Sequence, residues 1–457
     1  MLLKSLFGLS PNKLGHFRRM YCSRNIIKLK ERGMYQDIFP DVFLQDIVDL
    51  LNKAPQCVYA GFDPTSDSLH VGNLLVLINL LHWQRGGHNA IAVIGGATAK
   101  IGDPSGRNAE RDKLSTQLID LNIRGLNQNI EQIFDNHKKY FWSDKFLPEY
   151  KILNNESWYE KLTAINFIGG PGRYLRMGTL LSRTSVQSRL ATAAGMSFTE
   201  FSYQLFQSYD WLHLYSKYGC RFQIGGSDQM GNLMSGRDLI GKACRDTVYG
   251  LTLPLITTEM GDKFGKSAGN AIWLSPEKTS PFTFYQFWIR TPDSSVEKLL
   301  KLFTFNSVGT IKDTMRRHLE KPELRLAQKK LAEDVILLVH GKEGLEQAVA
   351  ASKALYEGNV AALGEMKVEE IVRMFDGASV VQILPEPGQS VLDMAMKAGC
   401  FPTSADAVRI ISAGGFYVNQ QKSTNPNEVL NPSVHRLSNN LSLLRVGKRN
   451  YYVVKWL

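Results

Sequence analysis

The segment Tyr59-Ala60-Gly61-Phe62-Asp63-Pro64-Thr65 is followed, two residues later, by Ser68-Leu69-His70-Val71-Gly72-Asn73. The first segment ends an apolar run typical of a buried strand, and the second leads into residues 74–81, whose Leu and Ile content predicts a helix. A strand that passes through a glycine turn into a helix is the building unit of a parallel α/β sheet. Because the first N–H groups of a helix are unpaired, this junction also suits a phosphate group. The sequence therefore predicts an α/β fold with its binding loops at the strand ends.

Further segments of the same kind place the α/β domain at residues 41–275. Apolar runs at 56–61, 90–95 and 221–225 each lead into a glycine-containing turn. Helical periodicity takes over in residues 276–375, where a set of apolar residues between Pro322 and Gly341 shares one helix face: Ala327, Leu331, Val335, Leu338 and Val339. Residues 376–390 contain two prolines and two glycines and predict a linker, and residues 391–457 predict a small mixed domain.

Charge is unevenly distributed along the 457 residues. The net charge is +11, and seven of the basic residues lie in residues 1–30, before the first acidic residue, Glu31. Such an acid-free basic start, with Leu, Phe and Ser interspersed, is typical of a mitochondrial presequence, although a basic arm that binds RNA has a similar composition. The rest of the chain carries only +4. The five cysteines are widely spaced without C-x-x-C pairs, which indicates neither a zinc site nor a disulfide framework. No apolar run reaches the roughly 18 residues of a membrane span.

A second glycine loop, Lys263-Phe264-Gly265-Lys266-Ser267, lies between the apolar runs 251–256 and 272–274. Two lysines around a glycine can fold over a triphosphate, but a solvated basic loop would look the same, and His70 alone would suit a helix cap. Taken together, the two segments resemble the paired HIGH and KMSKS signatures of class I aminoacyl-tRNA synthetases, present here as HVGN and KFGKS. The resemblance covers nearly all of the chain beyond about residue 40 and is closest to bacterial-type tyrosyl-tRNA synthetases.

The resemblance implies three domains. A Rossmann-like catalytic domain (41–275) would precede an α-helical anticodon-binding domain (276–375). The last part (391–457) would be a small α+β RNA-binding domain named after ribosomal protein S-four, whose motif resembles residues 404–409 and 414–419. Two positions depart from the family pattern. Asn73 replaces the commoner His but keeps an N–H donor, and Phe264-Gly265 replaces Met-Ser while both lysines remain.

The amino acid substrate depends on the residues of the pocket. Tyr203, Gln207 and Asp210 stand at i, i+4 and i+7, so on a helix they share one face. Resemblance to the tyrosyl family implies that the substrate ammonium is held by Asp103, Tyr203 and Gln207. It also implies that the phenolic hydroxyl is bound by Tyr59 and Asp210, with Gln223 beside the substrate. A buried carboxylate that faces an aromatic ring is costly unless a hydroxyl meets it, which favours tyrosine over phenylalanine.

ATP is the second substrate that the resemblance implies. The implied nucleotide-binding residues are Asp63, His70, Asn73, Gly226, Asp228, Gln229 and Lys266. The implied catalytic residues are Thr65 and His70 at the γ-phosphate end of the leaving pyrophosphate, with Lys263 and Lys266 closing over it. Arg107 and Arg111 are candidates for a second mobile clamp, although a solvated basic loop has the same composition. Mg²⁺ is expected to arrive with ATP, because the sequence shows no dedicated carboxylate cage for a metal.

The expected reaction joins tyrosine to tRNA(Tyr) through a tyrosyl-adenylate, for translation in the mitochondrial matrix. The family uses the segment that carries Arg173, Arg176, Arg183 and Arg189 for a homodimer interface and for acceptor-stem contacts, although a solvated helix face fits each arginine equally well. No membrane partner is expected. Two alternatives stay open: a tryptophanyl-tRNA synthetase, and an RNA-binding splicing factor derived from a synthetase.

Overall fold

The computed structural model describes residues 24–40, 44–106, 109–143, 146–256, 266, 267, 270–356, 364, 371, 379–447 and 450–457. The chain divides into two compact units, one formed by residues 1–275 and 291–339, the other by residues 276–290 and 340–457. This division differs from the predicted helical domain at 276–375, because the helices of that stretch are shared between the two units. Side-chain packing between segments distant in sequence sets the boundary, and sequence periodicity does not report such packing.

The first unit is built on a six-stranded sheet with the order β1-β6-β5-β2-β3-β4. The strands are β1 (Asp37–Phe39), β2 (Cys57–Phe62), β3 (Asn89–Ile94), β4 (Tyr150–Asn154), β5 (Cys220–Gly226) and β6 (Tyr249–Leu253). All neighbours run parallel except β1, which is antiparallel to β6. The predicted parallel α/β sheet is therefore confirmed.

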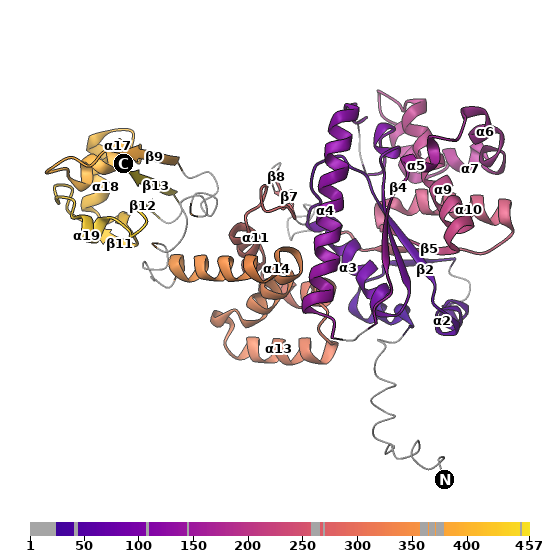
Figure 1. Ribbon diagram of the computed structural model, residues 1–457, viewed down its shortest axis with the longest axis horizontal. Coiled ribbons are helices and arrows are strands. Elements are labelled where there is room, and N and C mark those ends of the chain that lie inside the picture. The colour runs from indigo at the N-terminus through magenta and orange to yellow at the C-terminus, as the bar shows by residue number, and fades with distance from the viewer. Residues whose placement is uncertain are drawn as a thin grey trace, which may run out of the picture. The chain divides into compact units, whose positions relative to one another are not determined.

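Helices cover both faces of this sheet, as a doubly wound fold requires. Figure 1 shows α3 (Val71–Arg85) and α4 (Thr116–Tyr140) on one side of the strands, and α9 (Phe198–Tyr218) and α10 (Met230–Cys244) on the other. From β2 the chain passes to β3 on one side, while β5 lies on the other. The strand order reverses at this point, so a crevice is expected at the carboxyl ends of β2, β3 and β5.

The remaining residues between and after these strands are mostly helical. They form α2 (Leu44–Lys53), α5 (Glu156–Tyr159), α6 (Ala164–Gly169), α7 (Met177–Leu181), α8 (Thr184–Leu190), α12 (Asp293–Phe303), α13 (Val308–Glu320) and α14 (Leu326–Tyr356). Helix α14 is interrupted at Gly341, whose φ of 70° lies in the left-handed region that favours glycine. The five apolar residues predicted to share a face before this break are all buried. None of the helices in the described part of the chain is long and apolar enough to cross a membrane.

Part of the predicted presequence at residues 1–30 belongs to the folded first unit. A 3₁₀ helix, η1 (Ile26–Arg32), packs on the first unit, with Ile26 only 4% exposed. Arg32 is 8% exposed and donates hydrogen bonds to the carbonyl oxygens of Lys301, Thr304 and Asn306 at 2.7, 2.6 and 2.6 Å, at the end of α12. Residues 24–30 are therefore part of the folded unit, whereas the earlier residues of the predicted presequence lie outside the described chain.

The second unit contains α11 (Pro281–Ile289) and a five-stranded sheet with the order β11-β10-β12-β13-β9. Its strands are β9 (Ser379–Ile383), β10 (Phe416–Val418), β11 (Gln421–Ser423), β12 (Leu441–Val446) and β13 (Asn450–Trp456), and its helices include α17 (Val391–Lys397), α18 (Ser404–Ser412) and α19 (Pro432–His435). Strand β9 corrects the predicted linker at 376–390, because it pairs in parallel with β13 and buries Ile383 in the core. The weak apolar pattern of this strand was outweighed in the sequence by the neighbouring prolines and glycines.

Candidate active site

A cavity of about 980 Å³ lies in the first unit at the carboxyl ends of the central strands. It is lined by every predicted site residue whose side chain the structure describes: Tyr59, Asp63, Thr65, His70, Asn73, Asp103, Arg111, Tyr203, Gln207, Asp210, Gln223, Gly226, Asp228 and Gln229. Lys263 and Arg107 lie outside the described residues. Lys266 is described only as backbone, in the short strand β7 (Lys266–Ser267) that pairs with β8 (Asn270–Ala271). Residues from distant parts of the sequence thus converge on one crevice.

Asp210 forms the floor of one end of the cavity. It is 5% exposed, and its carboxylate accepts hydrogen bonds from Trp158 Nε1 at 2.9 Å, the Tyr159 hydroxyl at 2.8 Å and Asn155 Nδ2 at 3.1 Å. Burial raises the pKa of Asp210 to about 6, although these three donors oppose the rise. The site therefore holds a buried carboxylate that still has lone pairs to offer a ligand.

Two further polar atoms at this end lack partners. The Tyr59 hydroxyl and Gln223 Oε1 are buried without a hydrogen bond among the described residues, and their side chains are 1% and 2% exposed. Burial, with the nearby charge of Asp210 as the next cause, raises the pKa of Tyr59 well above its ordinary value, so its hydroxyl stays protonated. Buried polar groups are almost always paired in native proteins, so these two indicate a polar ligand.

A hydrogen-bonded chain joins this end of the cavity to Asp63, at the end of β2. Asn155 Nδ2 donates to Thr98 Oγ1 at 3.1 Å, and Thr98 Oγ1 donates to Asp63 Oδ1 at 2.7 Å. The Tyr203 hydroxyl donates to Asp63 Oδ2 at 2.8 Å. Burial also raises the pKa of Asp63 to about 6. Two carboxylates of raised pKa in one cleft are a common mark of a functional site.

Asp103 is held by residues from helix α10 and its preceding turn. Its carboxylate accepts hydrogen bonds from Gln229 Nε2 at 2.7 Å and Asn232 Nδ2 at 3.3 Å, and also from the Ser105 backbone N–H at 3.0 Å. Arg111 donates from Nε to the Asp103 carbonyl at 3.4 Å and is half-buried in the cavity wall. The solvated-loop interpretation of Arg111 therefore does not describe its position.

His70 is the N-cap of α3 at the other end of the cavity. Its Nδ1 accepts the Gly72 N–H at 3.1 Å, and Asn73 Oδ1 accepts the His70 N–H at 3.1 Å, which completes a capping box. A Cβ at position 72 would lie 2.9 Å from the imidazole, so glycine is needed for the ring to fold over the helix start. Because Nδ1 is an acceptor, the neutral ring carries its proton on Nε2. His70 is thus both a helix cap and a cavity-lining donor, and the two interpretations do not compete.

Backbone pairing holds the residues after the second signature beside the first. The Val71 N–H donates to the Ile272 carbonyl at 3.0 Å, and the Leu274 N–H donates to the Leu69 carbonyl at 2.8 Å. The rings of His70 and Trp273 meet edge to face with centroids 6.2 Å apart. HVGN and the segment that follows KFGKS, separated by about two hundred residues, therefore share one edge of the cavity.

Comparisons with known proteins agree with this geometry. Residues 51–357 match the family model described as "tRNA synthetases class I (W and Y)". The chain belongs to this synthetase family. The synthetase is 54% identical over 460 residues to a mitochondrial tyrosine–tRNA ligase of Drosophila melanogaster, covering 100% of this chain and 99% of the relative. It is 47% identical over 433 residues to the mitochondrial tyrosine–tRNA ligase of Homo sapiens, covering 94% of this chain and 91% of that relative. A solved structure of a C-terminally truncated mitochondrial tyrosyl-tRNA synthetase from Aspergillus nidulans matches with a TM-score of 0.67 and 30% identity, covering 76% of this chain and 97% of that one.

Several residues of the synthetase site were missed by the sequence reasoning: Thr98, Asn155, Trp158, Tyr159 and Asn232. Four of them lie directly after β3 or β4, at the edge of the sheet where binding residues gather. The polar and aromatic run Asn154–Tyr159 after the half-buried strand β4 was an available signal. It was overlooked because β4 lacks the strong apolar run that marked the other strands.

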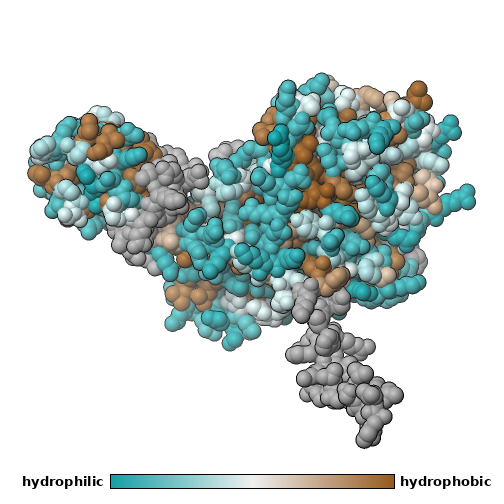
Figure 2. Space-filling view, in the orientation of Figure 1, coloured by the Kyte–Doolittle hydropathy of each residue, from teal (hydrophilic) through white to brown (hydrophobic). Residues whose placement is uncertain are grey.

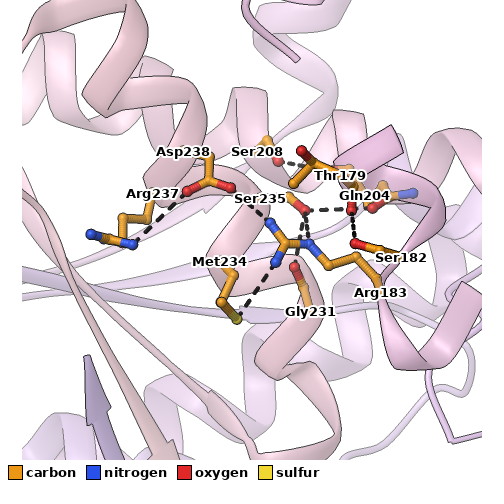
Figure 3. Close-up of polar contacts among 10 residues, drawn as sticks. All are labelled: Thr179, Ser182, Arg183, Gln204, Ser208, Gly231, Met234, Ser235, Arg237 and Asp238. Atoms are coloured by element: carbon orange, nitrogen blue, oxygen red, sulfur yellow. Dashed lines mark hydrogen bonds and ion pairs between the residues drawn. The ribbon is translucent and has the colours of Figure 1, made fainter. Parts of the chain in front are cut away.

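The arginines expected to contact tRNA divide into two kinds. Arg183 donates to Asp238 at 2.8 Å and to Ser235 at 3.3 Å on α10, as Figure 3 shows. Arg189 forms an ion pair at 2.7 Å with Glu200, and both side chains are only 3% exposed. These two arginines hold the segment between the sheet halves against α9 and α10, whereas Arg173 and Arg176 are exposed.

Proposed function

We propose that the synthetase is a tyrosine–tRNA ligase, which activates L-tyrosine with ATP and transfers it to tRNA(Tyr). The relatives of Drosophila melanogaster and Homo sapiens carry this activity in their names and align over nearly the whole chain. The observation that carries the choice of amino acid is the buried Asp210 carboxylate beside the unpaired Tyr59 hydroxyl and Gln223 amide oxygen.

Tyrosine fits this end of the cavity because it brings a hydroxyl to polar groups that are costly to leave unpaired. The substrate phenol would donate its proton to Asp210 and accept one from Tyr59, whose hydroxyl has no hydrogen-bond partner among the described residues. Phenylalanine would leave the buried Tyr59 hydroxyl without a hydrogen bond, at a cost of about 1–3 kcal/mol, and would not use the lone pairs that Asp210 still offers. Asp103, Tyr203 and Gln207 would hold the substrate ammonium, since two of them already present buried oxygen atoms to the cavity.

The adenylation step needs no nucleophile from the enzyme, because the tyrosine carboxylate attacks the α-phosphate of ATP. The synthetase would contribute positioning and charge stabilisation. Asp63, Gly226, Asp228 and Gln229 would contact the adenosine portion of ATP. Thr65, in the loop after β2, and His70 and Asn73, at the start of α3, would face the leaving pyrophosphate. The Nε2 proton of His70 would meet its growing negative charge.

The cationic partners of the pyrophosphate complete the proposal. Lys263 and Lys266 would close over it, and Arg107 and Arg111 would form a second clamp. Mg²⁺ would enter with ATP and neutralise phosphate charge, since the described residues hold no group of three or more His, Cys, Asp or Glu side chains arranged for a metal.

We also propose the partners and the compartment of the enzyme. The mitochondrial names of the relatives and the basic start of the chain support import into the mitochondrial matrix, with the presequence ending before residue 24. A homodimer is supported by exposed apolar side chains in the segment between the sheet halves, including Ile165 at 83%, Ile168 at 61% and Met177 at 59% exposure. In Figure 2, hydrophobic residues are visible in the region of α6 and α7, among other hydrophobic patches on the same face.

A pyrophosphate-exchange assay tests the function directly. The enzyme is incubated with ATP, labelled pyrophosphate and either tyrosine, tryptophan or no amino acid. Exchange that depends on tyrosine alone is expected. Exchange with tryptophan would favour the tryptophanyl alternative, and no exchange with either amino acid would favour a factor that only binds RNA. Neither alternative has support among the relatives compared.

A further inference from the structure

Tyr159 occupies an unusual position between two acceptors. Its hydroxyl oxygen lies 2.8 Å from Asp210 Oδ1 and 2.7 Å from the carbonyl oxygen of Phe206, one helical turn earlier in α9. A phenol has one proton to donate. When Asp210 is ionised, both neighbours can only accept, so the hydroxyl can hydrogen-bond just one of them.

The conflict disappears when Asp210 carries a proton. The carboxyl group then donates to the Tyr159 oxygen and the Tyr159 proton turns to the Phe206 carbonyl, but the stronger hydrogen bond from the Tyr159 hydroxyl to the charged carboxylate is lost. When Asp210 loses its proton, the Tyr159 hydroxyl turns back to the carboxylate. Burial raises the pKa of Tyr159 well above its ordinary value, so the hydroxyl itself stays protonated in both states. The direction of one hydroxyl is therefore linked to the charge of the neighbouring carboxylate.

We propose that Tyr159 is a positioning residue for the substrate: by donating to Asp210 it keeps the carboxylate ionised and free to accept the phenolic proton of tyrosine. This role rests on the proposed function, because it assigns Asp210 to the substrate hydroxyl. A protonated Asp210 presents a donor where the substrate also has a donor. Because the hydrogen bond from the Tyr159 hydroxyl keeps Asp210 ionised to lower pH, it extends the pH range in which tyrosine binds toward acid.

The other ionisable groups around Asp210 lie on β2, at its end and on α9. They are Tyr59, Asp63, Tyr203, Tyr209 and His213. The His213 ring stacks on Trp158 with centroids 4.6 Å apart, and the positive charge of Lys217 acts on His213. Burial raises the pKa of each of these tyrosines, so they remain neutral, and it lowers the pKa of His213. Asp63 titrates near Asp210, with a pKa of about 6. Because Asp63 and Asp210 titrate in the same pH range, the pH profile of a variant must be compared with that of wild type to assign the acid limb to Asp210.

The matched pair of variants is Tyr159→Phe and Tyr209→Phe. Both remove one phenolic hydroxyl beside Asp210, but within the described chain the Tyr209 hydroxyl makes no hydrogen bond to that carboxylate, although its ring packs on Tyr159 with centroids 5.6 Å apart. Loss of one hydrogen bond to a charged group should move the acid limb of kcat/KM for tyrosine upward by about one pH unit in Tyr159→Phe. This corresponds to about a fivefold loss at pH 6 and almost no loss at pH 8. Tyr209→Phe should titrate as wild type.

Tyrosine-dependent pyrophosphate exchange from pH 5.5 to 8.5 provides the measurement, with KM for ATP and the unfolding midpoint as checks of folding. A packing role for Tyr159 would lower kcat/KM by the same factor at every pH. Trp158→Phe removes the other donor to the same oxygen and should move the limb in the same direction. If the acid limb of kcat/KM for tyrosine in Tyr159→Phe coincides with that of wild type, the proposal is overturned. This holds even if Trp158→Phe moves the limb. A wild-type enzyme without tyrosine-dependent exchange would instead refute the proposed function, and this role with it.

Discussion

Replacing Asp210 by asparagine should make the free enzyme more stable while removing its activity. The pKa of Asp210 is about 6, against an ordinary value of 3.8, so ionising it costs about 3 kcal/mol more in the folded enzyme than in the unfolded chain. The stabilising effect of the bound proton is complete below pH 3.8 and is lost as the pH rises through 6. An asparagine carries no charge at any pH. At pH 7.5 Asp210→Asn should therefore unfold with a free energy about 1–3 kcal/mol higher than wild type, the lower value allowing for weaker hydrogen bonds from Trp158 and Tyr159.

The assay is calorimetric unfolding of both proteins without substrates between pH 4 and 8, together with tyrosine-dependent exchange. The stability difference should be small near pH 4 and largest above pH 7, while exchange is lost. Asp246→Asn serves as a control of opposite sign, because hydrogen bonds from Tyr215 and Thr247 and the ion pair with Arg221 outweigh desolvation and lower the pKa of Asp246. A variant that is less stable than wild type at pH 7.5, or a difference that does not change with pH, would refute the reasoning.

Three further substitutions separate the parts of the site. His70→Ala should slow tyrosine-dependent exchange by about 10²-fold with the KM for tyrosine nearly unchanged, and a collapse of tyrosine affinity at an unchanged rate would contradict the pyrophosphate role. Gly95→Ala places a methyl group against Asp63, and should destabilise the enzyme by about 1–3 kcal/mol and raise the KM for ATP. If the thermal unfolding midpoint and the KM for ATP both equal those of wild type, the loop has moved to accommodate the methyl group and the prediction is wrong. Asn232→Leu removes a donor from Asp103 and should raise the KM for tyrosine about tenfold, measured by exchange at saturating ATP, with no change expected for ATP.

Much of the first unit could be predicted because its signals are local. The apolar runs at 56–61, 90–95 and 221–225 became β2, β3 and β5, and the helix expected at 74–81 lies inside α3. Each strand of a parallel sheet is buried on both faces, so its sequence reads as a continuous apolar run even without knowledge of its neighbours.

The features that were missed depend on contacts between distant segments. Strand β9 is defined by its pairing with β13, about seventy residues later, and its own five residues carry only a weak pattern. The donors around Asp210 could not be ranked from the sequence, because Trp158 and Tyr159 look like ordinary core aromatics until the fold brings them to the carboxylate. The family resemblance supplied the candidate substrate-binding residues, whereas the residues that orient them follow from the structure alone.

The Arg32 contacts also constrain how the enzyme is made. They join residues 269 to 274 positions apart, so the first unit cannot be completed until residue 306 has left the ribosome or, in the proposed compartment, the import channel. Until then, the guanidinium and the surface that η1 covers stay in water, while the sheet core can already form. Contacts over such separations slow folding and leave partly folded chains open to aggregation. The chain is therefore expected to need a chaperone until α12 arrives, and fragments that end before residue 291 should remain partly folded even though they contain both nucleotide signatures.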